Sequence, residues 1–321
     1  MAISGILVPL DGAGITASVL PTVAALARPM RAAVHLMAVV ELRKRETPSI
    51  YYRVDADARP GEEDAAPLVP PDVQATLEGT ERRVERARSY LATLAGRLET
   101  LGIESSHEAF VGDPMTDIVR LARRQRFGLI ALSPHSRYAI GRGLGSVTDR
   151  VLHSSPIPLL VAPPLTESST RAVDLAIQTV IVGVDGSSVA EAAFGPARQI
   201  AEASGARLIL LRAIGGRARE AAWNTGAERV GRDIEADYKA GVRRYMEDAA
   251  IRIGVPCSTM LGDDDEVTEI LNAANNNPSA IIVMASQGES GMTKWRLGST
   301  TDRVIRESKR PVVVVPPLLS H

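Results

Sequence analysis

Two glycine-serine pairs are the residues of this sequence best suited to chemistry with an anion. Gly145-Ser146 and Gly298-Ser299 each stand where an amphipathic helix is expected to begin. A helix N-terminus offers unpaired N–H groups and the positive end of the helix dipole, a glycine permits close approach, and a serine hydroxyl adds a donor. Each pair is therefore a candidate phosphate-binding step, although Gly145-Ser146 taken alone also fits an ordinary helix cap.

One aspartate in each half of the chain follows a short apolar run. Asp11 comes after residues 5–10 (GILVPL) and Asp185 after residues 180–184 (VIVGV), and a glycine follows each. In an open parallel sheet, ligands bind beyond the carboxyl ends of the strands, where the strand order switches. We therefore expect each aspartate to face the loop after the fourth strand and the glycine-serine pair of its own half. A plainer interpretation, in which each aspartate caps the following turn, also stays open.

These residues occur twice because the sequence contains an internal repeat. Residues 144–152 (LGSVTDRVL) return as residues 297–305 (LGSTTDRVI), and proline-bounded apolar segments follow both, PLLVAPP and PVVVVPP. The openings at residues 5–12 and 180–187 match as well. A length of 321 residues also favours two domains over one.

Each half alternates apolar, β-branched runs with helical patterns. We expect Ser18 to cap the first helix and Pro29 to end it. Such alternation predicts right-handed crossovers and a parallel sheet covered on both faces. The predicted fold class is α/β, with two doubly wound open parallel-sheet domains in tandem. The expected strands are 6–10, 33–40, one ending near 111, 129–132 and 157–162, then 180–184, 207–213, one ending near 261, 281–284 and 311–315; the long helices are 18–28, 73–101, 188–204 and 227–253.

Two segments interrupt the repeat and set the domain boundaries. Residues 43–72 are rich in proline and acidic residues and are expected to form a loop inserted into a first domain, residues 1–164. Residues 165–177 follow a proline pair, contain serine and threonine, and are expected to link this domain to a second one, residues 178–321.

Composition excludes several classes of protein. The chain is 45% hydrophobic and 23% charged with a net charge of -1, which fits neither disorder nor a basic nucleic-acid binder. Its apolar runs are shorter than the ~20 residues of a membrane span. Cys257 is the single cysteine, and no Walker-type GxxxxGK[ST] motif occurs. The acidic run 263–266 precedes a helix, so it is interpreted as a helix start. We expect a cytoplasmic protein with no metal site made by protein alone, no nucleic-acid partner and no membrane association.

The second half resembles the universal stress protein family, and the repeat extends this resemblance to the tandem two-domain form over nearly the whole chain. That family's nucleotide-binding pattern is G-x-x-G, nine residues, then G-[ST]; the second half reads ASQG, nine residues, then GS. The resemblance implies an adenine nucleotide alpha-hydrolase-like fold with Asp185 beside the adenosine part of ATP. It also implies that Gly288 and Gly298 lie beside the phosphates and that Ser299 hydrogen-bonds them. Ala285 replaces the first glycine and restricts the backbone there.

The first half departs further from the family pattern. Residues 133–136 read SPHS where G-x-x-G is expected, and only eight residues separate Ser136 from Gly145. Pro134 also removes an N–H group and restricts the preceding residue. The resemblance therefore implies that the first site is less well preserved than the second, and its candidate residues are Asp11, Ser133, Ser136, Gly145 and Ser146.

Three functions are compatible with these features. The first is a regulatory ATP binder rather than a fast enzyme, because spacing assigns no general base, activated nucleophile or metal cage. Bound magnesium and slow ATP hydrolysis stay open. The alternative is a structural or partner-binding module that binds no nucleotide, which the altered motifs favour. An adenylate-forming enzyme would need a serine- and glycine-rich loop after the first strand, of which DGAG and DGSS are only fragments.

Assembly is partly predictable from the last strand of each half. These strands, residues 157–162 and 311–315, are apolar and bounded by prolines. Unpaired strand edges favour association, and the resemblance implies that such strands pair across two domains. We expect this pairing to occur within the chain, and a further dimer of chains stays open.

Overall fold

The computed structural model describes residues 2–11, 16–42, 71–133, 144–163, 176–215, 228–288 and 297–317. The first half contains β1 (Gly5–Pro9), η1 (Thr16–Val19), α1 (Leu20–Met30), β2 (Ala33–Val40), α2 (Pro71–Thr100), β3 (Ser105–Val111), α3 (Pro114–Arg124), β4 (Leu129–Leu132), α4 (Ser146–Ser154) and β5 (Leu159–Val161). The second contains β6 (Thr179–Gly183), η4 (Ala190–Ala193), α5 (Phe194–Ser204), β7 (Arg207–Ala213), α7 (Glu228–Ile253), β8 (Cys257–Gly262), α8 (Glu266–Asn275), β9 (Ala280–Ala285), α9 (Ser299–Glu307) and β10 (Val312–Val315).

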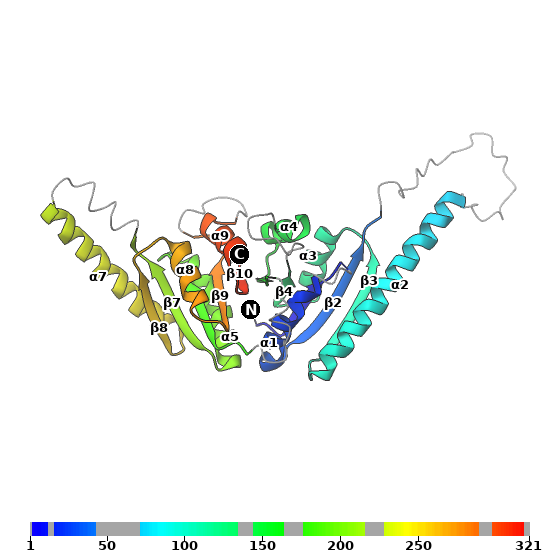
Figure 1. Cartoon of the computed structure of the whole chain (residues 1–321), viewed down its shortest axis with the longest axis horizontal. Helices are drawn as coiled ribbons and strands as arrows, with labels where there is room; N and C mark the ends of the chain where they lie inside the picture. Colours follow the sequence, from blue (N-terminus) through cyan, green and yellow to red (C-terminus); the bar gives the residue numbers. More distant parts are fainter. Residues whose placement is uncertain are drawn as a thin grey trace, which may run out of the picture.

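The described strands form one continuous ten-stranded sheet. Its order is β3-β2-β1-β4-β5-β10-β9-β6-β7-β8, so each half contributes five neighbouring strands. Figure 1 shows the two halves on either side of the β5–β10 seam, with α2 and α7 at the outer flanks. The doubly wound α/β fold expected from the sequence is confirmed, and each expected strand is present with small shifts at its ends.

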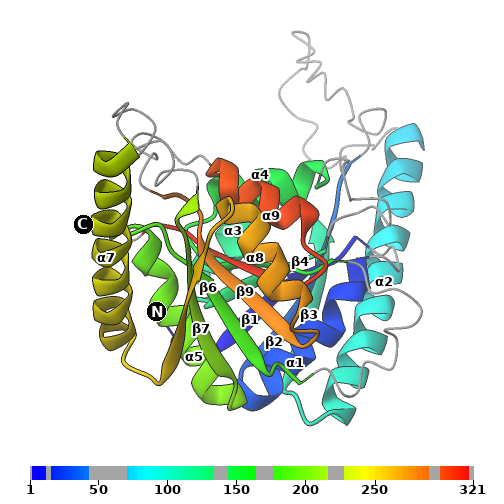
Figure 2. The same ribbon diagram turned by 60° about the vertical axis from the view of Figure 1, so that its left-hand side comes forward.

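Helices cover both faces of the sheet, and each face has its own apolar core (Figure 2). On one face, α1, α2, α5 and α7 contribute buried residues that include Leu26, Leu91, Ile200 and Met246. On the other face, α3, α4, α8 and α9 contribute a second cluster. The inner strands β4, β6, β9 and β10 are therefore buried along their whole length, which explains their continuous apolar sequence.

The start and end of α1 differ from the sequence prediction. Pro29 lies inside the helix, which ends one residue later at Met30, and Arg31 adopts a left-handed conformation with φ of 51°. A proline this close to the end removes one hydrogen bond of the last turn only, so the predicted end of the helix at residue 28 was wrong by two residues. Ser18 lies in the preceding η1 turn, and its Oγ is 3.0 Å from Ser133 Oγ. It therefore does not cap α1, whose N-cap position is Val19.

Contacts on the sheet and on both of its faces join the described parts of the two halves. β5 pairs antiparallel with β10, with Leu160 opposite Val313. On one face α1 packs against α5, and on the other Arg306 of α9 lies 3.8 Å from Asp149 of α4. The predicted pairing of the terminal strands within the chain is confirmed, and it merges the two expected sheets into one.

Parts of the predicted insertion and linker lie outside the described residues. These parts are residues 43–70 of the insertion and residues 165–175 of the linker. Within the described ranges, no helix is long and apolar enough to span a membrane.

Candidate functional site

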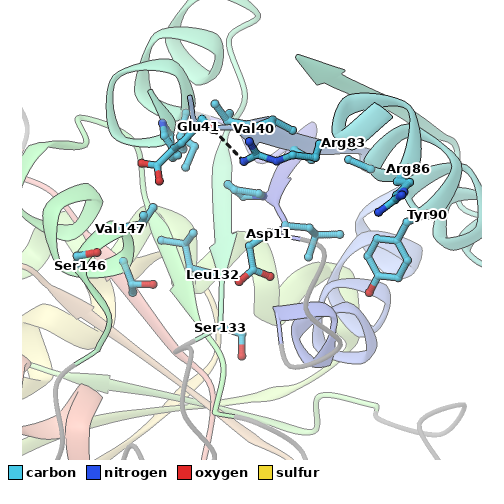
Figure 3. Close-up of a pocket in the computed structure, with 18 residues that line it drawn as sticks. Asp11, Val40, Glu41, Arg83, Arg86, Tyr90, Leu132, Ser133, Ser146 and Val147 are labelled. Carbon is cyan, nitrogen blue, oxygen red and sulfur yellow. Dashed lines mark hydrogen bonds between the residues drawn. The ribbon is translucent and has the colours of Figure 1, made fainter. Parts of the chain in front are cut away.

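A cavity of ≈ 680 Å³ lies at the carboxyl edge of the first-half strands (Figure 3). The ends of β1, β2 and β4 form its floor, the starts of α3 and α4 form one side, and α2 forms another. Asp11, Ser133 and Ser146 all line it. The structure therefore brings together three of the five residues predicted for this half, from the three chain segments expected to meet.

The start of α4 faces this cavity without a capping side chain. Gly145 is the N-cap residue, with φ of 86° and ψ of 143°, and Ser146 and Val147 line the cavity. Only glycine adopts this backbone conformation without strain. The positive φ keeps the first N–H groups of α4 beside the cavity, which is the arrangement expected of an anion-binding helix start. Ser136, the remaining candidate of this half, lies outside the described residues.

Three polar residues of α2 also line the cavity, and they were not predicted from the sequence. Arg83 donates through Nη2 to the Glu41 carbonyl oxygen at 2.8 Å, and Arg86 lies one turn further along the helix. Tyr90 follows on the same face, and its pKa is raised by burial first and then by the negative charge of Asp11. Their i, i+3, i+7 spacing places them on one helix face, a signal that could have indicated a polar wall.

The second half brings Asp185 and Gly288 into direct proximity. A Cβ placed on Gly288 would lie 2.2 Å from Asp185 Oδ2, so only a glycine fits at this distance from the carboxylate. The other carboxylate oxygen, Oδ1, accepts hydrogen bonds from Ser187 N at 2.9 Å and Ser187 Oγ at 2.7 Å. The turn-capping interpretation is therefore confirmed for Asp185, and its second oxygen faces the predicted glycine loop.

The other candidates of the second half lie next to this contact. Gly298 donates its N–H to the Ser286 carbonyl oxygen at 2.7 Å, and Thr301 Oγ1 donates to the Ala285 carbonyl oxygen at 2.9 Å. These two bonds fix the start of α9 against the end of β9. Gly298 has a φ of −66°, and Ser299, the first residue of α9, is exposed. The loop between Gly288 and residue 297 lies outside the described residues.

In the second half, Arg212 lies beside the turn that follows Asp185, and this arginine was not predicted from the sequence. The Arg212 guanidinium on β7 lies against Gly186, where an added Cβ would be 2.6 Å from Nη1 and 3.0 Å from Cζ. Its Cζ lies 5.1 Å from the ring centroid of Tyr245 on α7. The Tyr245 hydroxyl donates to Glu191 at 3.2 Å, and Arg252 donates to the same carboxylate at 2.7 Å. Burial first, and then Glu191, raise the pKa of Tyr245 to about 12.

The acidic run at residues 263–266 behaves as a helix start. Asp265 is the N-cap residue of α8, and its Oδ1 accepts from Val267 N at 3.1 Å and Thr268 N at 3.3 Å. The Thr268 hydroxyl and these backbone donors hold the pKa of Asp265 below its usual value. The sequence interpretation of this run is confirmed.

A second cavity, of ≈ 910 Å³, lies between α3 and α4 and contains none of the predicted site residues. Met115 and Val119 supply apolar surface, and the basic side chains come from Arg120, Arg123, Arg124, Arg150 and His153. The corresponding helix of the second half, α8, has no basic residue in its last turn. The last turn of α3, which contains Arg123 and Arg124, therefore differs in charge from that of α8.

Comparison with known proteins identifies relatives for both halves. The model of the universal stress protein family matches residues 3–163 and 176–316. The universal stress protein YxiE of Bacillus subtilis is 29% identical over 147 residues, covering 42% of this chain and 97% of that protein. A universal stress protein of Mycolicibacterium smegmatis is 23% identical over 258 residues, covering 79% of this chain and 82% of that protein. The crystal structure of a universal stress protein from Archaeoglobus fulgidus superposes with a TM-score of 0.68 at 19% identity, covering 98% of this chain and 99% of that chain.

Proposed function

The chain belongs to the universal stress protein family, with one family domain in each half, and on this premise we propose that it is a regulatory protein that binds ATP. In this proposal nucleotide occupancy, rather than fast turnover, is the functional output. We place the protein in a reducing cytoplasm, since Cys257 is its single cysteine.

The first-half cavity is the observation that supports this proposal. Its volume of ≈ 680 Å³ falls in the range of ordinary small-molecule pockets. The Asp11 carboxylate can accept hydrogen bonds from an adenosine, whereas the start of α4 and the Ser146 hydroxyl can donate to phosphate oxygens. Arg83 and Arg86 add positive charge on the opposite wall. The residues present therefore fit an adenine nucleotide, with or without magnesium.

The cavity suits binding better than catalysis. Its described lining residues include no histidine, cysteine or lysine. Ser133 is buried, and its Oγ lies 3.0 Å from another hydroxyl, Ser18 Oγ, rather than from a base. A serine nucleophile needs an adjacent general base within hydrogen-bond reach. The described residues therefore place no activated serine nucleophile at the cavity, and slow hydrolysis of bound ATP would proceed by direct attack of water.

The sequence motif favours the second half as the nucleotide site, whereas the described cavity favours the first half. The sequence pattern is better preserved in the second half, and that ranking stays a prediction. The described cavity lies in the first half, where the nucleoside side is open and the start of α4 is exposed to a ligand. We propose the first half as the principal nucleotide site on this ground.

Calorimetric titration with ATP, with and without magnesium, tests the proposed function. The expected result is saturable binding, a raised melting temperature on adding ATP, and weaker binding of GTP. Chromatography of the denatured protein, purified without added nucleotide, checks for nucleotide retained from the cell. The proposal fails if no adenine nucleotide is retained, no heat is measured and ATP leaves the melting temperature unchanged.

A second function, binding of a partner without nucleotide, is favoured by the second cavity, which lies between α3 and α4. Its apolar floor and arginine rim match a short acidic peptide carrying apolar side chains. A fluorescent acidic peptide should bind the wild type and bind the Arg120→Ala, Arg124→Ala double variant at least fivefold more weakly. Arg82→Ala on the outer face of α2 is the control and should bind as the wild type does. Equal binding by both variants would remove this function.

A further inference from the structure

The strand register shows which residues of the two halves are equivalent at the nucleotide site. Pro9 of β1 lies opposite Met37 of β2, and Gly183 of β6 lies opposite Leu211 of β7. The next residues along β2 and β7, Ala38 and Arg212, therefore occupy equivalent positions in the two halves. On the central strand of each half, the aspartate follows two residues after Pro9 or Gly183. A methyl group in one half thus corresponds to a long cationic side chain in the other.

Ala38 leaves space in the first half. It is buried and lines the cavity together with Asp11 from the end of β1 and Tyr90 from α2. The nucleoside side of the cavity is therefore made by the end of the first strand, the next strand along the sheet, and the long helix that follows.

Arg212 fills the corresponding space in the second half. In the second half, the corresponding elements are the Asp185-Gly186 turn after the first strand, the neighbouring strand β7, and the long helix α7, which contributes Tyr245. The guanidinium lies against the Gly186 backbone, and a Cβ there would be 3.0 Å from both Cζ and Nη2. The side chain therefore extends from β7 to the turn that carries the aspartate.

Contacts on the far side hold Arg212 in place. Its guanidinium lies over the Tyr245 ring at 5.1 Å, and the Arg252 guanidinium lies 5.5 Å from the same ring centroid. Glu191 binds both the Tyr245 hydroxyl and Arg252, which fixes the ring. The Tyr245 ring attracts the guanidinium that lies over its face, so the free energy needed to displace Arg212 opposes ligand entry.

We propose that Arg212 takes the place of the nucleoside in the second half, so that the chain binds one adenine nucleotide, in the first half, instead of two. This inference rests on the proposed function and adds its stoichiometry and location. Arg212 is the residue that determines which half accepts the ligand. The glycine motif of the second half is better preserved, but Arg212 closes the nucleoside side of the cleft beside it.

A pair of reciprocal substitutions tests this inference by calorimetric titration with ATP. The wild type should bind one ATP per chain, and Arg212→Ala, which opens the second cleft, should bind two. Ala38→Arg, which closes the first cleft, should bind none. Arg252→Ala removes a cation from the same tyrosine without opening the cleft, so it should still bind one ATP.

The outcomes separate this inference from the proposed function. A wild type that binds two ATP molecules keeps the proposed function and overturns the role of Arg212. A wild type that binds none overturns both. An Arg212→Ala variant that still binds one ATP also overturns the inference, and so does an Ala38→Arg variant that keeps full binding. Arg212→Ser, checked for folding by circular dichroism, replaces Arg212→Ala if that variant does not fold, with the same expectation of two.

Discussion

The candidate nucleotide clefts of the two halves differ on opposite sides. In the first half, Pro134 and two serines interrupt the glycine motif, yet Ala38 leaves a cavity of ≈ 680 Å³. In the second half, Gly288 and Gly298 are kept, yet Arg212 lies against Gly186 beside the aspartate. The backbone proposed to face phosphate and the side chains proposed to face the nucleoside can therefore change independently.

This difference shows what a linear motif records. The G-x-x-G and G-[ST] pattern describes the end of one strand and the start of one helix, where backbone N–H groups meet phosphate. The proposed nucleoside side is formed by β2 or β7 and by α2 or α7, which the pattern does not include. A half can thus lose motif residues and keep a cavity, or keep the motif and lose space.

The largest expected effect comes from removing the aspartates separately. Asp11→Ala should weaken ATP binding about 10- to 100-fold, because it removes a charged hydrogen-bond acceptor from the cavity wall. Asp185→Ala should leave the affinity within about twofold. Calorimetric titration of both variants measures this contrast. A larger loss in Asp185→Ala than in Asp11→Ala would reverse our assignment of the halves.

The second effect distinguishes the glycines that precede α4 and α9. Gly145→Ala should destabilise the protein by about 1–3 kcal/mol, because φ of 86° with ψ of 143° is a glycine-only conformation. Gly298→Ala should change stability by less than about 0.5 kcal/mol, since φ is −66° and the added Cβ would lie 3.4 Å from the Ser286 carbonyl oxygen. Urea unfolding of the two variants checks this difference. Equal midpoints would show that backbone strain does not separate the glycines.

A third, smaller effect tests the α2 wall. Arg86→Ala should weaken ATP binding about two- to fivefold at low salt, because Arg86 is exposed and its attraction to phosphate is partly screened. The loss should shrink as the salt concentration rises. Arg82→Ala is the matched control, since Arg82 lies within 3.7 Å of Glu78 and does not line the cavity. Affinities measured over a salt series decide the matter, and equal losses in both variants would show that α2 contributes only general charge.

The smallest effect concerns the pH dependence of the Tyr245 cluster. Burial raises the pKa of Tyr245 to about 12, so its contribution to stability is fully present below the unfolded value of about 10 and is lost as the pH rises through 12. The wild type should therefore lose about 0.5 kcal/mol relative to Tyr245→Phe across this window, a small amount because the cluster is half exposed. Chemical unfolding of both proteins at several alkaline pH values measures the difference, and parallel pH curves would contradict it.

The sequence predicted the fold well because its signals are local or repeated. The apolar runs predicted β1 to β10 with small errors. The expected helix 188–204 ends at the predicted residue, because Gly205 adopts a left-handed conformation with φ of 63° after α5. The apolar edges of the terminal strands and the family resemblance correctly predicted the β5–β10 pairing. The end of α1 was placed two residues too early because a proline costs little in the last turn of a helix.

The candidate site was only partly predictable. Asp11, Ser133 and Ser146 meet because parallel strands end at a common edge, a consequence of topology that can be inferred from the sequence. Arg83, Arg86 and Tyr90 come from a helix whose rotation about its axis depends on packing. The equivalence of Ala38 and Arg212 appears only once the strand register is known. Long side chains that cross from one element to another are thus the part that periodicity does not predict.

The antiparallel β5–β10 seam leaves the described sheet with two outer edges, β3 and β8. Along β3, the Glu108 carboxylate lies 3.1 Å from His35 Nε2 of the neighbouring strand β2, and the acidic side chain at this edge opposes the addition of another strand. β8 reads CSTMLG and carries no charge, and Ser258, Thr259 and Met260 are exposed. In a concentrated solution or a destabilised variant, aggregation by strand addition would therefore begin at β8, and a lysine at Thr259 would protect that edge.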